Sequence, residues 1–334
     1  MENILIVKFR ALGDTVIGLA AVQYLRETFP AAQIHYAVPQ WTAPLFKHVK
    51  LDQVNIVPIQ LRSVVDFFRF YRTCAQLKPD CIFELQQRGT TGKFFKLFSK
   101  IKHIKYYFHN HHIKTPGFVL DQGINKPVIQ RDLDGVWSGI NDMMPDQFAV
   151  PNFLDYPLNM PLASEVTKDD SIVIGVVATR QTKMWPIQHY GTLIRLIIDR
   201  GVAQKVIIPL SNMPKDIEIE QQLNQLELPQ EVDIIKQPLD QLTRTLAKCQ
   251  KYIGNDTGLK HICIGLGLET YTFFGPEPPK EWHPYDTRYH TYFYRENLDC
   301  RTIKKHFCDL SWCDSMICLN HFTPEAVFKR IFNS

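Results

Sequence analysis

The 334-residue sequence contains no run of 18 apolar residues, the length at which a stretch becomes a candidate membrane-spanning helix. Its first residues also lack the basic region and apolar core of a secretory signal, because Met1, Glu2 and Asn3 lead directly into a short apolar stretch. We therefore expect a protein that stays in the cytoplasm and has no membrane span.

Paired C-x-x-C motifs, which are typical of structural zinc sites, are also absent from the sequence. Four of the eight cysteines lie near the C-terminus at wide and irregular spacings: Cys300, Cys308, Cys313 and Cys318. In a cytoplasmic protein we expect these thiols to be reduced. The spacing therefore predicts no metal site, and it leaves the role of the four cysteines open.

No aspartate or glutamate occurs between Glu84 and Asp121, an interval that holds seven lysine and arginine residues and four histidines. The net charge of the whole chain is only +4, and no recognised nucleic-acid motif accompanies the basic interval, so we expect no nucleic-acid partner. The interval is either a solvated basic face or a surface for an anionic acceptor or an anionic lipid. Under the second interpretation, the acceptor-binding residues are basic side chains in and near it: Arg62, Arg88, Lys93 and Lys96.

Short apolar runs alternate with helical patterns along most of the chain, which predicts parallel sheets with helices on both faces. The expected strands comprise residues 4–7, 33–38, 54–58, 81–85, 104–108, 172–177, 205–209, 232–235 and 270–274, with another beginning at 252. Helices are expected at 42–48, 64–77, 92–98, 187–199, 214–226 and 239–248. Prolines accumulate between 145 and 170, so we expect a domain of residues 1–160, a second of 161–322 and a C-terminal helix over 323–334.

Residues 63–71 are rich in aromatic side chains and contain Arg69, and Arg62 and Arg72 flank the segment. We interpret this segment as one half-buried face of a helix. A membrane anchor is the alternative, because Arg62, Arg69 and Arg72 would suit the surface of an anionic membrane.

The first expected strand is followed by Gly13 and Asp14, and then by a helical pattern that ends near Pro30. A group placed there stands at the carboxyl edge of a parallel sheet, where α/β proteins bind ligands. Asp14 is therefore either a ligand-facing carboxylate or an ordinary helix N-cap.

The strand at 172–177 restarts the pattern and is followed by Thr179, Thr182 and Lys183. Two hydroxyl groups and one ammonium suit a diphosphate, although the spacing is not that of a P-loop. A second anion site is expected after the strand at 252, where Asp256, Thr257 and Gly258 precede a helix that contains His261. In the alternative interpretation, Asp256 is only a helix cap and His261 only a packed helix histidine.

Three of these stretches resemble the bacterial glycosyltransferase family that contains the ADP-heptose:lipopolysaccharide heptosyltransferases, which is glycosyltransferase family nine. They are ILIVKFRALGD at the start of the chain, T-x-x-x-K-x-W-P after residue 178, and GNDTGLKH followed by FFGPEPP, where Glu277 replaces the usual threonine. The resemblance implies the α/β fold called GT-B, with two doubly wound Rossmann-like domains that face each other across a cleft. It also implies that Asp14 is the catalytic base.

The same resemblance assigns the donor site to the second domain. The donor-binding residues that it implies are Thr179, Thr182, Lys183, Asp216, Asp256, Thr257, Gly258 and His261. Among these, Asp216 would hold the ribose, and Lys183 would bind the diphosphate and stabilise it catalytically as it leaves. No metal and no cofactor is implied beyond the nucleotide sugar, which would be ADP-heptose.

The implied reaction is transfer of a heptose, with inversion, from ADP-heptose to a hydroxyl of the lipopolysaccharide inner core. The partners would be the nucleotide sugar, a lipopolysaccharide core precursor and, peripherally, the cytoplasmic face of the inner membrane. The alternatives are transfer of a different activated sugar to another anionic glycan, a GT-B-fold nucleotide-sugar epimerase, and a binding protein without activity.

Overall fold

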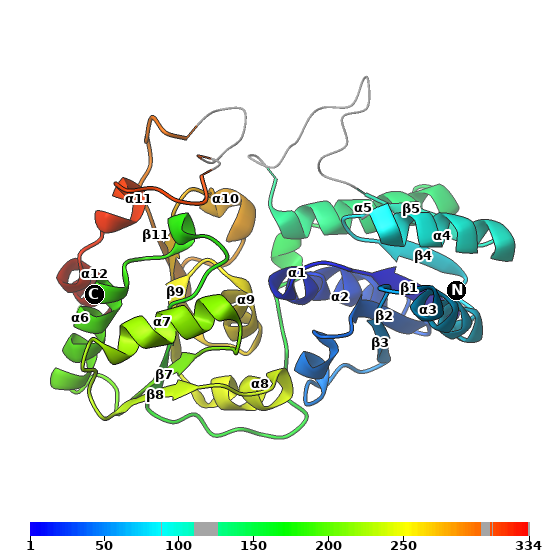
Figure 1. Cartoon of the computed structure of the whole chain (residues 1–334). Coiled ribbons are helices and arrows are strands. Elements are labelled where there is room, and N and C mark those ends of the chain that lie inside the picture. Colours follow the sequence, from blue (N-terminus) through cyan, green and yellow to red (C-terminus); the bar gives the residue numbers. More distant parts are fainter. Residues whose placement is uncertain (88, 110–125, 302–307, 309, 333–334) are drawn as a thin grey trace. The chain divides into compact units, whose positions relative to one another are not determined.

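A computed structural model describes residues 1–87, 89–109, 126–301, 308 and 310–332 of the chain. The chain folds into two compact units, Met1–Pro161 and Leu162–Ser334, and each is an α/β structure built on a parallel sheet (Figure 1). Among the described helices, none combines the length and the apolar character that a membrane crossing requires.

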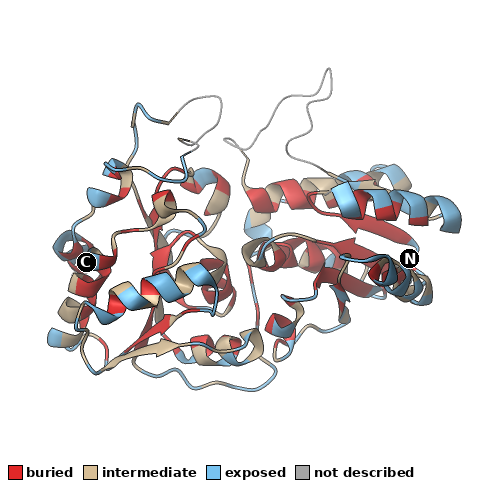
Figure 2. Ribbon diagram, in the orientation of Figure 1, coloured by how far each residue is buried: buried red, intermediate tan, exposed pale blue. Residues whose placement is uncertain are grey.

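The first unit contains a five-stranded parallel sheet in the order β3-β2-β1-β4-β5. Its strands are β1 (Asn3–Val7), β2 (Gln33–Pro39), β3 (Val54–Ile59), β4 (Cys81–Glu84) and β5 (Lys105–Phe108). The central strand β1 is buried on both faces, which explains why its sequence is a continuous apolar run (Figure 2).

Helices cover both faces of this sheet. They are α1 (Leu12–Ile17), α2 (Leu19–Thr28), α3 (Val64–Leu77), α4 (Gly89–Lys102) and α5 (Val128–Met143), with single turns η1 (Ala43–Phe46) and η3 (Phe153–Asp155). Ile82 of β4 belongs to the core under α3 and α4, whereas its neighbour Phe83 lies against Gly139 of α5. Because successive strand residues point to opposite faces, α5 and the α3–α4 pair cover opposite faces of the sheet.

The first unit differs from the sequence-based expectation at two elements. The helix expected at 42–48 is only the turn η1, which has Pro44 at its start. The helix α5 was not expected, although its apolar positions Ile129, Leu133, Val136 and Ile140 have clear helical spacing and are buried.

The second unit contains a six-stranded parallel sheet in the order β11-β10-β9-β6-β7-β8. Its strands are β6 (Ser171–Gly175), β7 (Lys205–Pro209), β8 (Val232–Ile235), β9 (Lys251–Asn255), β10 (Glu269–Phe274) and β11 (His290–Tyr294). The last of these was not expected from the sequence. After β6, the chain adds β7 and β8 on one side of that strand. It then adds β9, β10 and β11 on the other side, which is the doubly wound order.

The helices of the second unit are α6 (Ile187–Asp199), α7 (Pro214–Asn224), α8 (Leu239–Lys248), α9 (Gly258–Gly265), α10 (Pro279–Trp282), α11 (Ile317–Asn320) and α12 (Pro324–Phe332), with the turn η4 (Gln181–Lys183). The C-terminal helix α12 packs on α6. Trp185 stacks on Phe273 with ring centroids 4.2 Å apart, and Tyr190 meets Trp185 edge to face. This aromatic core includes Trp185 of the loop that follows β6 and so holds that loop against the sheet.

The direction of winding reverses between β1 and β4 in the first sheet and between β6 and β9 in the second. In doubly wound sheets, ligands bind outside the carboxyl ends of the strands at such a reversal. A functional site is therefore expected at the residues that follow these four strands. The two doubly wound parallel sheets confirm the expected fold class of two Rossmann-like units.

Candidate active site

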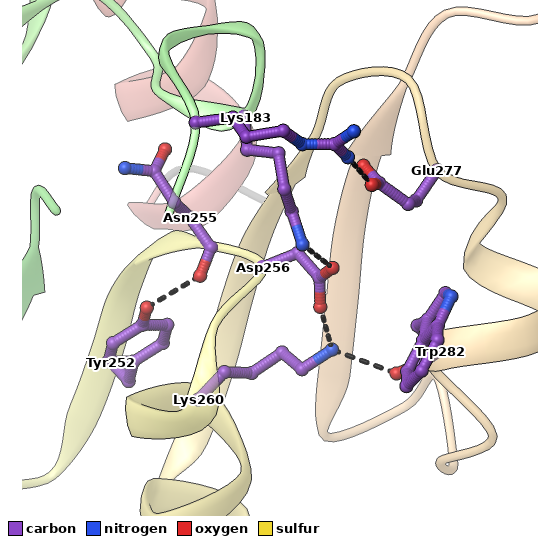
Figure 3. Close-up of polar contacts among 8 residues, drawn as sticks. Lys183, Tyr252, Asn255, Asp256, Lys260, Glu277 and Trp282 are labelled. Carbon is purple, nitrogen blue, oxygen red and sulfur yellow. Dashed lines mark hydrogen bonds and ion pairs between the residues drawn. The ribbon is translucent and has the colours of Figure 1, made fainter. Parts of the chain in front are cut away.

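Three charged side chains meet where the second sheet reverses. Lys183, in the loop after β6, places its Nζ 2.9 Å from Oδ2 of Asp256, the residue that follows β9. Lys260, in the first turn of α9, places its Nζ 2.6 Å from the other carboxylate oxygen, Oδ1 (Figure 3). One carboxylate therefore holds two ammonium groups, and we call these residues the Lys-Asp-Lys cluster.

The two lysines of the cluster differ in their exposure. The side chain of Lys260 is fully buried, donates to the carbonyl of Trp282 at 2.9 Å and lies 4.8 Å from the ring centre of Phe274. Lys183 retains 16% of its side-chain exposure. An anion that approaches from solvent can therefore contact Lys183, whereas Lys260 acts on that anion only through its charge.

Burial and charge act against each other in the cluster. Burial alone would raise the pKa of Asp256, but Lys183 and Lys260 outweigh that effect and hold the pKa far below its ordinary value. Burial lowers the pKa of Lys260 to about 8, although Asp256 partly offsets this shift. At neutral pH the cluster therefore contains two positive charges and one negative charge, which leaves a net charge of +1.

The positive cluster lies beside the N-terminus of α9. Thr257 occupies the N-cap position of this helix, and Gly258 is its first residue. Asp256 directs its carboxylate to the two lysines, so the interpretation of Asp256 as a simple helix cap does not describe its contacts. Unpaired backbone N–H groups, the helix dipole and a net positive charge together suit a phosphate group.

Asn255 connects the two loops that carry the cluster. Its side-chain oxygen accepts hydrogen bonds from the backbone N–H of Trp185 and the hydroxyl of Tyr190, both at 2.9 Å, and its amide donates to the carbonyl of Val176 at 2.8 Å. The hydroxyl of Tyr252 donates to the Asn255 carbonyl. These bonds join the loop after β6 to the end of β9 and thereby fix Lys183 opposite Asp256.

Two residues predicted to bind the donor are buried and form hydrogen bonds within the chain, so their contact with the donor stays a prediction. The side chain of Thr182 is buried, and its hydroxyl donates to the carbonyl of Leu310 at 2.8 Å. His261 is also buried, its Nδ1 is hydrogen-bonded to the hydroxyl of Tyr285, and burial holds its pKa well below the ordinary value. Its geometry fits the alternative interpretation, in which His261 is a packed, neutral helix histidine.

Two other predicted donor residues lie at the same edge of the sheet but do not contact the cluster through any bond found among the described residues. Thr179 is exposed in the loop after β6. Asp216 lies in the first turn of α7 and accepts a hydrogen bond from the backbone N–H of Ser211 at 2.6 Å, which shapes the turn after β7. The predicted contact of Asp216 with a ribose stays a prediction.

Glu277, which departs from the motif that the sequence resembles, forms an ion pair with Arg180. The partners come from the loops after β10 and β6, and both side chains are largely buried. Arg180 neutralises the carboxylate, so the glutamate adds no net negative charge to this edge of the sheet. The presence of Glu277 is therefore compatible with an anion site nearby.

Asp14 lies where the first sheet reverses, in the first turn of α1. The N-cap of α1 is Ala11, so Asp14 is not the helix cap that the alternative interpretation requires. One carboxylate oxygen of Asp14 is buried and has no hydrogen-bond partner among the described residues. Burial raises its pKa, and Lys8 and Arg10 offset this only in part. A carboxylate with one buried oxygen that lacks a hydrogen-bond partner and with a raised pKa is typical of catalytic sites.

Lys8, at the end of β1, is held by a residue far away in the sequence. Its Nζ lies 2.6 Å from Asp132 Oδ2, with both side chains fully buried, and His109 Nε2 lies 3.0 Å from the other oxygen of Asp132. Asp134, two residues further on, pairs with Lys126 instead. These two aspartates have the D-x-D spacing, but their carboxylates are bound to different lysines. No group of three or more metal-ligating side chains occurs among the residues with described positions.

A pocket of about 500 Å³ opens at the carboxyl ends of β1, β2 and β3. Its lining includes two guanidinium groups, two side-chain amides and an exposed indole, contributed by Arg10, Arg62, Gln40, Gln60 and Trp41. Arginine binds carboxylate and phosphate groups through paired hydrogen bonds, and an aromatic ring can pack on a sugar face. The pocket therefore suits an anionic sugar.

The predicted acceptor residues are not gathered in one place. Arg62 lines the pocket, but Lys93 and Lys96 lie on the exposed side of α4 and do not line it. Arg88 lies outside the described residues. Arg10 and Trp41 line the pocket without having been predicted, although each lies in the loop that follows an expected strand.

Residues 97–309 match the model of glycosyltransferase family 9 (heptosyltransferase). The chain is also similar to a lipopolysaccharide heptosyltransferase 1 from Campylobacter coli, with 22% identity over 299 residues that cover 83% of this chain and 84% of that relative. The matched region includes the whole Lys-Asp-Lys cluster.

Two solved structures have a similar fold. The Escherichia coli heptosyltransferase WaaC with ADP-2-deoxy-2-fluoro heptose has a TM-score of 0.67 and 19% identity over 99% of both chains. A family 9 glycosyl transferase from Veillonella parvula DSM 2008 has a TM-score of 0.73 and 15% identity over 98% of this chain and 95% of that one. At these identities the structural comparisons establish the fold, and the predicted GT-B class is confirmed.

Proposed function

The chain belongs to glycosyltransferase family 9 (heptosyltransferase), and from that premise we propose that it transfers a heptose from ADP-heptose to a hydroxyl of the lipopolysaccharide inner core, with inversion. Membership of this family makes the chain a glycosyltransferase, so the epimerase and the inactive binding protein are not retained. The observation that carries the proposal is the Lys-Asp-Lys cluster beside the N-terminus of α9. A relative of known structure that binds an ADP-heptose analogue supports the choice of donor.

In the proposed donor site, Lys183 and the N-terminus of α9 bind the diphosphate. As the bond between the anomeric carbon and the phosphate oxygen breaks, the departing ADP gains negative charge. Fixed donors and charges that stabilise this developing charge lower the barrier without having to reorganise. Lys183 has the required exposure and is held in place by Asp256.

Lys260 explains how Lys183 can be bound by a carboxylate and still attract an anion. With Asp256 and Lys183 alone, the site would be neutral. The buried ammonium of Lys260 compensates the carboxylate and leaves the charge of Lys183 available to the diphosphate. Lys260 is thus a positioning residue that acts through Asp256 and does not contact the donor.

In the proposed acceptor site, Asp14 removes the proton of the attacking hydroxyl. The oxygen forms a bond to the anomeric carbon on the side opposite to the leaving diphosphate, and the proton passes to the carboxylate. Burial raises the pKa of Asp14, which makes its carboxylate a stronger base than that of an exposed aspartate. We propose that the pocket with Arg10, Trp41 and Arg62 binds anionic sugars of the acceptor.

The proposal is tested by incubating the purified chain with ADP-heptose and a deacylated inner-core acceptor. We expect release of ADP and one added heptose with inverted anomeric configuration, with no change of the donor when the acceptor is omitted. We also propose that the reaction needs no metal, so transfer should continue in EDTA. Among nucleoside diphosphates, ADP at 100 times its Kd should stabilise the fold by about 2.7 kcal/mol. Stabilisation by UDP or GDP but not by ADP would contradict the choice of donor.

Replacing Lys260 tests the charge of the cluster. In Lys260→Met, Asp256 pairs with Lys183 alone, and we expect the affinity for ADP to fall roughly tenfold because the site becomes neutral. The parent should lose affinity as the pH rises through about 8, the pKa of Lys260, because deprotonation makes the site neutral as well. The variant should lack this step in the pH profile of ADP binding.

The double variant Lys260→Met with Asp256→Asn is the matched control, because it restores the net charge of +1. If charge explains the role of Lys260, this variant regains most of the ADP affinity. A double variant that binds ADP no better than Lys260→Met would show that Lys260 serves only the packing of the site.

A further inference from the structure

The outer side of helices α3 and α4 carries large apolar side chains that no other part of the described chain covers. Val64, Val65 and Phe68 of α3 are 72%, 64% and 68% exposed, and Leu97 and Ile101 of α4 are 61% and 52% exposed. Basic residues lie among them: Arg69, Arg72, Lys93, Lys96 and Lys100. We call these ten residues the α3–α4 face.

The two helices lie side by side and present this face together. Phe67 packs on Phe94 and Tyr71 packs on Phe98, with ring centroids 5.7 Å and 5.3 Å apart. Each pair is one helical turn from the other, so the helices run in the same direction. Phe70 and Phe94 also enter the core beneath them. Because the inner sides are thus occupied, the residues of the α3–α4 face are those that remain on the solvent side.

The α3–α4 face has no exposed carboxylate to balance its positive charge. The single acidic residue of the two helices, Asp66, is buried and forms a capping box with Ser63 at the start of α3. It also pairs with Arg69 at 3.7 Å, so α3 and α4 supply no carboxylate for the other four basic residues of the face. Lys96 extends over the ring of Phe108, with its Nζ 5.3 Å from the ring centre. Long basic side chains that lie along apolar surface and end in solvent are typical of membrane interfaces.

We propose that the α3–α4 face binds the surface of an anionic phospholipid bilayer. Exposed apolar side chains on a helix can enter the boundary of the acyl chains, while interspersed lysines and arginines bind the lipid phosphates. A single-stranded nucleic acid would favour exposed aromatic rings for stacking, but Phe68 is the one aromatic member of the face. A mostly acidic soluble partner would leave the five apolar side chains without a complementary surface.

The position of the face also relates to the acceptor pocket. Arg62 lines the pocket, and Val64, the first residue of α3, lies two residues further along the chain. A bilayer on the α3–α4 face would therefore lie next to the pocket mouth, where a sugar attached to a membrane lipid could enter. This link to the acceptor rests on the proposed function, whereas binding of the bilayer does not.

The test is flotation of the full chain with lipid vesicles. We expect the chain to float with vesicles of phosphatidylethanolamine and phosphatidylglycerol, to remain at the bottom with vesicles of phosphatidylcholine alone, and to be released by added salt. The charge variant combines Arg69→Gln, Arg72→Gln and Lys100→Gln and should lower the partition coefficient roughly 100-fold. The apolar variant combines Phe68→Ser, Leu97→Ser and Ile101→Ser and should lower it at least roughly tenfold.

The matched control removes three exposed basic residues of the second unit with Arg200→Gln, Arg244→Gln and Lys248→Gln. It has the same net charge as the charge variant and should float like the parent. Both α3–α4 variants alter exposed side chains, so they should keep the parent melting temperature and the parent turnover with a deacylated, water-soluble acceptor.

Several outcomes would overturn the proposal. They are equal flotation with both kinds of vesicle, equal loss in the matched control, and unchanged flotation in the charge and apolar variants. A chain that floats as expected but transfers no heptose would instead overturn the proposed function and leave the bilayer surface in place. A chain that transfers heptose to soluble acceptor but never floats would overturn the bilayer surface and leave the proposed function in place.

Discussion

Asp14→Asn should fold normally, bind ADP-heptose within a few-fold of the parent and lose roughly 10²–10⁴ in turnover, which is the usual range when a general base is removed. The substitution keeps the shape of the side chain but removes its ability to accept a proton. Because the cluster proposed to bind the donor lies in the other unit, the loss should be in kcat and not in the affinity for ADP.

The pKa of Asp14 gives this prediction a pH signature. Its pKa is raised by burial in the folded protein, so the ionised form is less favourable there than in the unfolded chain. The stability that this group contributes is therefore present at acidic pH and is lost as the pH rises through the folded-state pKa. At neutral pH, Asp14→Asn should melt at the same temperature as the parent or higher, and this difference should shrink towards acidic pH.

Turnover of the parent should decline as the pH falls through the raised pKa of Asp14, since only the carboxylate can accept the proton. Residual activity in Asp14→Asn should lack that acidic limb. Thr28→Val, which changes a hydroxyl that donates to the carbonyl of Tyr24 in α2, is a suitable control outside the site. An unstable Asp14→Asn protein with full turnover per folded molecule would move the base to another residue.

The sequence predicts the fold well because most of the buried parallel strands are continuous apolar runs, which are easily recognised in a sequence. It also predicts which loops are placed to hold a ligand, because the loops at the carboxyl ends of the strands are known once the strands are identified. Asp14, Lys183 and Asp256 were all predicted in this way, and the structure places each of them in a loop or first helical turn that follows a strand. Arg10 and Trp41 occupy equivalent positions, but they line one pocket only because three separate strand ends converge there.

The sequence is less informative about which side chains face a ligand. Thr182 and His261 have suitable chemistry and spacing, but the fold buries both side chains and bonds the Thr182 hydroxyl to Leu310 and the His261 Nδ1 to Tyr285. Conversely, Lys260 occupies an unremarkable position between the glycine and the histidine of its motif. Its significance depends on full burial and on a carboxylate that already holds Lys183, and neither can be read from the order of residues alone.

Lys183→Ala should reduce kcat/KM for the donor by an amount that corresponds to about 2–4 kcal/mol of transition-state stabilisation, by analogy with the loss of one preorganised anion-stabilising donor. The affinity for ADP should fall as well, whereas the affinity for adenosine should stay near that of the parent because Lys183 is proposed to contact the diphosphate alone. Asp256 keeps its bond to Lys260 in this variant, so the buried carboxylate is not left unpaired and the fold should persist.

Two further measurements separate the role of Lys183 in the reaction from a general effect of charge. Lys215→Ala, on helix α7 of the same unit, removes a lysine of equal charge outside the cluster and should leave kcat/KM unchanged. Lys183→Arg keeps the charge but spreads it over a planar group, so it should recover the affinity for ADP more fully than the turnover. Equal kcat/KM in Lys183→Ala and the parent would contradict the assignment, because the charge that develops on the departing diphosphate would then have to be stabilised by the N-terminus of α9 alone.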